Sequence, residues 1–352
     1  MAPTAAPAYK PVGFENATRH NLRDIGASLP YSANGTVTVD LPKMGLLSRL
    51  FVLVKGSFTN DITTLTKSSF GPYNLIKRIR LTANNGTDII NCSGFELYLI
   101  NLVSCENYRN DQSGDDQTYK FDVTASQTDY IRFGFELPLT VNDRDLIGLF
   151  LLQNPQTVLT LAIDWDNINA NSGPYTNGGT GARTAISINA YVVAEFFAVP
   201  QHIEDYPRLD YIYQTIAIKQ AIVAVGEQIF NMPIGNLYTR IVTFHEHNAV
   251  LAPSSDVTKI EVRYNQTEVP YTMDSDVLRW ILRDMYGRDV PQGVFALDFN
   301  HQGIPDLGTA RDYVNSHYLT DFQWRPVVAA GATLGSGTNF LHVINQQLVK
   351  LA

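Results

Sequence analysis

Phe70-Gly71-Pro72-Tyr73-Asn74-Leu75-Ile76-Lys77-Arg78-Ile79-Arg80-Leu81, running on to Ser93-Gly94-Phe95-Glu96, is the stretch that decides the fold. Gly71-Pro72 predicts a turn, because proline fixes φ and has no backbone N–H. The mixed apolar and basic run after it predicts a short strand. Asn84-Asn85-Gly86 predicts a hairpin turn, since Asn and Gly tolerate positive φ. Ser93-x-x-Glu96 has the capping-box pattern that starts a helix.

The composition predicts a large folded protein rich in β-sheet. The chain has 352 residues, of which 45% are hydrophobic and 17% charged. This length is enough for two domains, and this apolar content is enough for sizeable cores. Plentiful aromatic and β-branched residues favour sheets. The formal net charge of −8 argues against a dedicated nucleic-acid-binding protein, which would have clustered Lys and Arg.

Targeting and cysteine patterns indicate synthesis in a reducing cytoplasm. The longest apolar runs, such as Leu146–Leu152, are too short to span a bilayer, and Met1–Pro7 has no apolar core of a secretory signal. Cys92 and Cys105 flank the predicted helix, so a disulfide between them would need distorted geometry. We interpret them as two buried or idle thiols.

In the first half of the chain, apolar periodicity predicts strands at 35–41, 46–59, 75–83, 88–91, 130–139, 157–165 and 185–199. The segment 94–103 is expected to form an amphipathic helix whose apolar face carries Phe95, Tyr98, Leu99 and Leu102. Residues 107–118 read as a polar loop. Residues 164–184 read as a long Asn/Gly-rich loop with little to bury.

The second half repeats this order without repeating the sequence. Strands are expected at 213–225, 238–247, 257–264, 293–299, 319–328 and 339–349. A helix is expected at 275–286, capped by Asp274 or Ser275 at its start and by Gly287 in the left-handed conformation at its end.

The predicted fold class is all-β: two tandem eight-stranded antiparallel jelly rolls, each with a short helix. Chains with about eight irregularly spaced antiparallel strands usually close into sandwiches, barrels or jelly rolls. We expect an N-terminal arm at 1–14, the first jelly roll at 15–199, a linker at 200–211 and the second jelly roll at 212–352.

His245-Glu246-His247 is the most enzyme-like motif. On a strand, residues i and i+2 share a face, so both imidazoles could reach one metal ion, as the His-x-His of cupins does. A cupin places a Glu three or four residues later, where this chain has Val250 and Leu251. We therefore interpret His245 and His247 as two polar residues at the end of a strand.

The other polar motifs also lack essential parts of a site. Asp164-x-Asp166-x-x-Asn169 resembles a calcium loop but lacks the required Gly and the bidentate Glu. Asp143 and Asp145 are expected to cap the segment after them. Gly178–Gly181 follows no strand-to-helix pattern. The cluster Lys77-Arg78-x-Arg80 splits across the two faces of its strand. We predict no catalytic residue, no cofactor-binding residue, no metal ligand and no cofactor.

The sequence Ser69-Phe70-Gly71-Pro72-Tyr73-Asn74-Leu75-Ile76-Lys77-Arg78-Ile79, followed by Ser93-Gly94-Phe95, resembles the double jelly-roll major capsid protein of tectiviruses. These are tailless double-stranded-DNA phages with a membrane inside the capsid. The family pattern is Phe-Gly-Pro-x-Asn-Leu-(Val/Ile)-x-Arg, then a Ser-Gly-aromatic helix start. The match covers Ser69–Val103.

This resemblance implies a structural protein of the virion capsid, assembled in the host cytoplasm, and not an enzyme. It implies a homotrimer that forms pseudo-hexagonal capsomers and tiles an icosahedral shell around an internal membrane. The implied partners are other copies of the chain, penton or vertex and minor capsid proteins and the viral membrane, without sequence-specific nucleic acid. By the same resemblance, the loop 164–184 would lie on the outer surface, and the arm Met1–Pro11 would contact neighbours or the membrane side.

Two other classes of function remain as alternatives. One is a bicupin-like metal-dependent enzyme on the same sandwich fold, with His245 and His247 as its ligands. The other, weaker alternative is a carbohydrate-binding β-sandwich, suggested by the Tyr and Trp content. The aromatic residues are spread along the predicted strands, so core packing explains them better.

Overall fold

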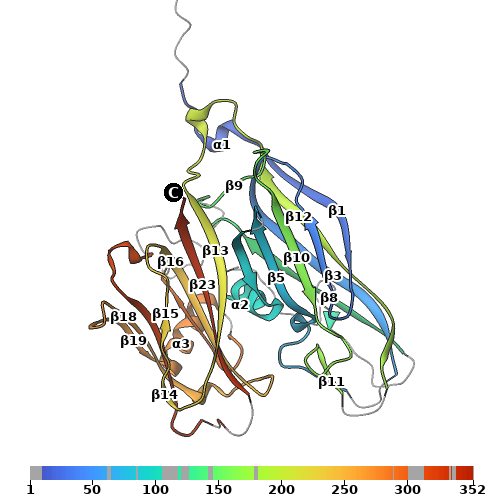
Figure 1. Ribbon diagram of the computed structural model, residues 1–352, viewed down its shortest axis with the longest axis vertical. Helices are drawn as coiled ribbons and strands as arrows, with labels where there is room; N and C mark the ends of the chain where they lie inside the picture. The colour runs from blue at the N-terminus through green and yellow to red at the C-terminus, as the bar shows by residue number, and fades with distance from the viewer. Residues whose placement is uncertain are drawn as a thin grey trace, which may run out of the picture.

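The computed structural model describes residues 10–61, 65–84, 86–104, 118–119, 127–141, 146–177, 181–287, 289–299, 313–332, 334 and 338–351. Two β-sandwiches lie side by side, one built from the N-terminal strands and one from the C-terminal strands (Figure 1). Among the described residues, no helix is both long and apolar enough to span a membrane.

The first sandwich is formed by two facing four-stranded layers. One layer has the order β1-β12-β3-β8, and the other has the order β2-β10-β5-β6. Its strands are β1 (His20–Pro30), β2 (Thr36–Asp40), β3 (Leu46–Asn60), β5 (Ile76–Ala83), β6 (Thr87–Cys92), β8 (Gln127–Pro138), β10 (Leu159–Trp165) and β12 (Arg183–Phe197). Helix α2 (Gly94–Ser104) follows β6.

The second sandwich has the same layout. One layer has the order β13-β23-β16-β20, and in the other β14 and β15 pair with β22, followed by β18 and β19. Its strands are β13 (Tyr211–Ala221), β14 (Gly226–Glu227), β15 (Phe230–Asn231), β16 (Leu237–His247), β18 (Val257–Tyr264), β19 (Glu268–Asp274), β20 (Val294–Asp298), β22 (Phe322–Val328) and β23 (Asn339–Lys350). Helix α3 (Ser275–Tyr286) follows β19.

Both sandwiches are jelly rolls with one topology. When the principal strands of each are counted from one to eight, with β14 and β15 together as the second strand of the second roll, the layers read 1-8-3-6 and 2-7-4-5. The helix follows the fifth strand in both rolls. The predicted double jelly roll and the predicted repeat of architecture are therefore confirmed.

Short elements complete the chain. They are α1 (Phe14–Ala17), β4 (Leu65–Lys67), η1 (Tyr73–Leu75), β7 (Thr118–Tyr119), β9 (Phe150–Leu151), β11 (Tyr175–Asn177), η2 (Ile203–Asp205), β17 (Val250–Leu251), η3 (Ser254–Asp256), β21 (Val314–Asn315) and η4 (Ser316–Tyr318).

The local signals in the sequence are confirmed at several places. The β5–β6 hairpin forms at the Asn-Asn-Gly turn, with Asn84 at φ 49°. In the capping box, the Ser93 amide donates to Glu96 Oε2 (2.6 Å) and the Glu96 amide donates to Ser93 Oγ (3.3 Å). Helix α3 is capped by Asp274, which accepts from the Asp276 amide, and by Gly287 at φ 63°.

Two long strands, β1 and β19, were not predicted. Most residues of both strands are exposed, so the alternation of buried and exposed side chains that marks a strand in the sequence is weak there. Each forms the edge of its layer, and no strand among the described residues pairs with its outer side.

The prediction that the loop 164–184 buries little is wrong. Ile168 and Tyr175 are completely buried, and β11 within this segment pairs with β4. The buried guanidinium of Arg183 donates to the Ile168 carbonyl (2.6 Å) and lies over the Tyr175 ring. The polar loop predicted at 107–118 lies almost entirely outside the described residues.

The start of the described chain is anchored to the segment 200–211. The backbone amides of Val12 and Gly13 donate to the buried carboxylate of Asp205 (2.8 and 3.1 Å). Phe14 packs in a small apolar cluster with Leu46 and Leu149. Residues 1–9 of the predicted arm lie outside the described residues.

Substitution of Gly94 by Ala is expected to destabilise the protein by about 1–3 kcal/mol through overpacking. A Cβ at this position would lie 2.2 Å from the Tyr73 carbonyl oxygen, a backbone atom that cannot move cheaply. Gly86→Ala is the matched control, because its Cβ would meet no atom closer than 3.9 Å. Chemical denaturation measures both variants. Equal stability of the two would contradict the close contact between η1 and the start of α2.

Candidate functional site at the junction of the two jelly rolls

One sheet runs through both jelly rolls. Strand β6 of the first roll pairs in parallel with β13 of the second, with Ile90 opposite Thr215 and Asn91 opposite Ile216. The Gln214 amide group also donates to the Asp88 carbonyl (2.9 Å). Backbone pairing therefore joins the two rolls, and the ten-stranded sheet that results includes strands from both.

The stretch that decides the fold lies at this junction. The Phe70 ring packs edge-on against Phe95 of α2, at 4.8 Å between centroids, and also contacts Phe244 of the second roll at 6.1 Å. The neighbouring Ser69 Oγ accepts a hydrogen bond from the Leu251 amide of the second roll (3.1 Å). Ser69 and Phe70, just before the predicted Gly71-Pro72 turn, thus contact the second roll directly.

Helix α2 fills the space between the rolls (Figure 1). Every residue from Gly94 to Val103 is buried, so the prediction of an amphipathic helix is wrong. On one side Asn101 exchanges two hydrogen bonds of 2.8 Å with the Glu136 backbone of the first roll. On the other side Phe95 packs against Phe244 of the second roll at 5.4 Å. The face that would meet solvent in a single roll is covered by the neighbouring roll.

A charged network crosses the junction. His342 on β23 donates from Nδ1 to Glu96 Oε1 (2.8 Å) and from Nε2 to Glu246 Oε2 (2.6 Å). Lys219 on β13 donates to the same oxygen of Glu246 (2.9 Å). The His342 ring stacks on Phe244 with 4.2 Å between centroids. Because both ring nitrogens face carboxylates, both act as donors and the imidazole carries a positive charge.

The pKa values at the junction reflect this pairing. Burial alone lowers the pKa of His342, but its hydrogen bonds to Glu246 and Glu96 outweigh burial and raise that pKa. Burial raises the pKa of Glu96, and the bond to His342 overcomes this and lowers it. Burial likewise opposes ionisation of Glu246, yet His342 and Lys219 bring the pKa of that carboxyl to about 2. Pairing therefore favours the ionised form of each of these three groups over its neutral form.

A cavity of about 190 Å³ opens beside this network. Its apolar wall includes Phe70, Phe95 and Phe244, and its polar wall includes Lys219, Glu246 and His342. A second apolar cluster closes the junction elsewhere, where Tyr213, Tyr313 and Leu348 of the second roll meet Val141 and Ile147 of the first.

Among the residues that the structure describes, the two histidines of the His-x-His motif lie in different surroundings. His245 is completely buried, at 3.6 Å from Asp256 Oδ2, and its pKa is lowered chiefly by burial. His247 Nδ1 instead lies 2.6 Å from Asn339 Oδ1. Within the described ranges, no group of three or more His, Cys, Asp or Glu is placed to hold a metal ion. Both histidines lie at the end of β16, and of the two His245 is completely buried.

The calcium-loop motif is divided among separate contacts. Asp164 accepts from the Thr36 hydroxyl (2.6 Å), and Asn169 pairs with the backbone of Arg183 (2.7 and 3.2 Å). Arg80 of the basic cluster lies 3.7 Å from Asp164.

Several predicted residues lie outside the described residues. They are Asp143, Asp145, Cys105 and positions 178–180 of the Gly-rich run. Cys92, in contrast, is a buried free thiol.

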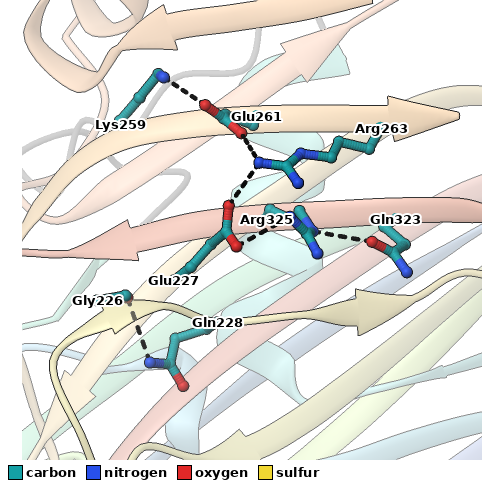
Figure 2. A network of polar contacts seen from close by, with 8 residues as sticks. All are labelled: Gly226, Glu227, Gln228, Lys259, Glu261, Arg263, Gln323 and Arg325. Atoms are coloured by element: carbon teal, nitrogen blue, oxygen red, sulfur yellow. Dashed lines mark hydrogen bonds and ion pairs between the residues drawn. The ribbon is translucent and has the colours of Figure 1, made fainter. Parts of the chain in front are cut away.

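A second polar network lies on the outer layer of the second roll (Figure 2). Glu227 of β14 bridges Arg263 of β18 (3.0 Å) and Arg325 of β22 (2.9 Å). Glu261 in turn bonds Arg263 (3.0 Å) and Lys259. Glu261 is buried and the other charged side chains are partly exposed. All belong to one roll, so the network does not link the rolls.

The comparisons with known proteins agree with this architecture. The family described as P3 major capsid protein N-terminal matches residues 10–198. A search of curated proteins found no match.

Solved structures share the fold at low sequence identity. The major capsid protein of STIV is 13% identical, with a TM-score of 0.72 over 94% of this chain and 97% of that chain. PBCV-1 VP54 is 10% identical, with a TM-score of 0.64 over 99% and 97%. The major capsid protein P2 from bacteriophage PM2 is 11% identical, with a TM-score of 0.58 over 95% and 98%.

The protein is thus of the double jelly-roll class, in which two rolls are joined into one block. The chain belongs to the P3 major capsid protein family, and it is a major capsid protein of a virus. The resemblance of Ser69–Val103 to tectivirus capsid proteins is consistent with this membership.

The charged network predicts a specific pH dependence of stability. The pKa of His342 is raised on folding, so its contribution is complete below the unfolded value of 6.5 and is lost as pH rises through the folded value. The pKa of Glu246 is lowered to about 2, so its contribution is present above the unfolded value of 4.5 and is lost as pH falls through about 2.

His342→Gln should therefore lower the free energy of unfolding near pH 6. As pH rises above 6.5, the free energy of unfolding should fall less in this variant than in the wild type. Removing one member of a buried charged network typically costs about 3–5 kcal/mol. Denaturant unfolding at several pH values from 6 to 9 measures the effect. Lys259→Gln in the outer network is the control and should keep the wild-type slope. An unchanged slope in His342→Gln would show that the network does not carry the charge assigned to it.

Proposed function

We propose that this protein is a shell-building subunit: a homotrimer that forms pseudo-hexagonal capsomers, which tile an icosahedral shell around an internal membrane. The observation that carries the proposal is the pair of topologically identical rolls joined by one continuous sheet. Three such blocks supply six similar rolls, the number that a pseudo-hexagonal unit needs. The resemblance to tectivirus capsid proteins supports the internal membrane.

We further propose that the rolls occupy residues 15–199 and 212–352, with an arm at 1–14 and a linker at 200–211. The strand orders support this division, because β1 to β12 contain one complete set of eight principal strands and β13 to β23 contain the other. The anchoring of Val12 and Gly13 by Asp205 supports a fixed exit point for the arm. We propose that Met1–Pro11, which precedes this anchor, contacts neighbouring capsomers or the membrane side.

The role proposed is structural, and catalysis has no part in it. We propose that the partners are other copies of the chain, vertex and minor capsid proteins and the membrane. The site of assembly is the host cytoplasm. The buried, neutral imidazole of His245 is supported better as a packing residue than as a metal ligand.

Purified protein is expected to have three times the mass of the 39.2 kDa chain in size-exclusion chromatography with light scattering. Treatment with a chelator should leave this mass unchanged, because the proposed trimer needs no metal. A monomer at micromolar concentration would contradict the trimer. Stoichiometric metal that is lost in His245→Ala would instead favour the bicupin-like alternative.

A further inference from the structure

The junction within the chain shows which elements of one jelly roll pack against the next. The first roll contributes its fifth strand, β6, and the helix after it, α2. The second roll contributes its first strand, β13, with β23 and β16 beside it. The contact consists of parallel pairing between the fifth and first strands and burial of the helix face against the second roll.

The corresponding elements at the other end of the second roll are uncovered. Strand β19 is its fifth strand and forms the edge of its layer. In α3 the side chains of Val277 and Trp280 are 51% and 66% exposed. Counted from the two helix starts, they occupy the positions of Glu96 and Leu99 in α2, both of which are buried, Glu96 against His342 of the second roll.

Trp280 stands out among the tryptophans of the chain. The other two, Trp165 and Trp324, are 1% and 0% exposed. A large exposed aromatic side chain beside a second apolar residue is typical of a surface that a partner covers.

The first strand of the first roll is uncovered in the same way. Strand β1 forms the edge of its layer, and within the described residues no strand pairs with its outer side. Its Leu22 side chain is exposed. Long unpaired edge strands are hazards that proteins cover or protect. The edges β1 and β19 lie on opposite sides of the two-roll block, β1 on the right of the view and β19 on the left (Figure 1).

The charges of these two edges are complementary. Arg19 just before β1 and Arg23 within it are exposed, as is Asp24, so these three side chains leave one net positive charge at this edge. Glu268, Asp274 and Asp276 are exposed along β19 and the first turn of α3. A basic edge at one end of the block and an acidic edge at the other favour contact between two copies in a head-to-tail arrangement.

We propose that β19 and α3 of one copy dock against β1 of the next copy, and that this contact repeats between chains the one that β6 and α2 make with β13 within a chain. The inference rests on the proposed self-assembly and names the surfaces that perform it. Such a contact is heterologous, so it closes into a ring when the rotation between copies allows. Trp280 then becomes buried in the assembly.

Acrylamide quenching of tryptophan fluorescence tests this burial in the assembled wild-type protein. The difference between wild type and Trp280→Phe isolates the emission of Trp280, because the other two tryptophans are buried in the single chain. We expect blue-shifted emission and little quenching from Trp280 in the assembly. Emission typical of water-exposed indole, with free quenching, would overturn the proposed docking surface even where light scattering shows a trimer.

Charge reversal tests the pairing of the edges. Arg23→Glu should weaken assembly by about tenfold or more, measured as the dissociation constant by light scattering or sedimentation. Adding Glu268→Arg to this variant should restore much of the lost affinity between copies. The exposed aromatic Tyr318, which lies outside both edges, provides a control: Tyr318→Ala should assemble like wild type, and Trp280→Ala should not.

Circular dichroism confirms folding of each variant, since all these positions are exposed. Wild-type assembly in Arg23→Glu and Trp280→Ala would overturn the inference and leave the proposed trimer standing. A wild-type monomer would contradict the proposed function itself.

Discussion

The burial of α2 between the two jelly rolls is the constraint on which the rest of the structure depends. Helix α2 is attached to its own roll by the hydrogen bonds of Asn101 to the backbone of β8. The opposite face of the same helix then presents Phe95 and Glu96 to the second roll. One helix therefore belongs to two cores, so the two rolls form one block.

Apolar packing and charge have different roles at this junction. Aromatic pairs such as Phe95–Phe244 and Phe70–Phe95 contribute about 0.5–1.5 kcal/mol each beyond the area they bury. A buried charged network gains little over apolar packing, because desolvation offsets most of its attraction, but losing one member costs several kcal/mol. The apolar contacts thus supply most of the attraction. The bond of His342 to Glu96 joins the two rolls, and the bond of His342 to Glu246 holds the imidazole in place for it.

The sequence predicted the features that short-range rules control. The capping box at Ser93 and Glu96, the caps of α3 and the β5–β6 turn all depend on residues a few positions apart. The double jelly roll followed from the strand order and the resemblance of Ser69–Val103. What the sequence did not reveal depends on distant partners: Glu96 is hydrogen-bonded to a residue 246 positions away. No periodicity within α2 could show that its second face would be covered.

Native-state hydrogen exchange along α2 tests the central claim most directly. The claim predicts that the α2 amides exchange as slowly as those of β13 and β23, because the helix can open only when the whole block unfolds. Helix α3, which is covered on one side only in the single chain, should exchange faster than α2 when the assembly is dissociated. Fast exchange in α2 while β13 and β23 stay protected would contradict the claim, since it would mean that the rolls separate without unfolding.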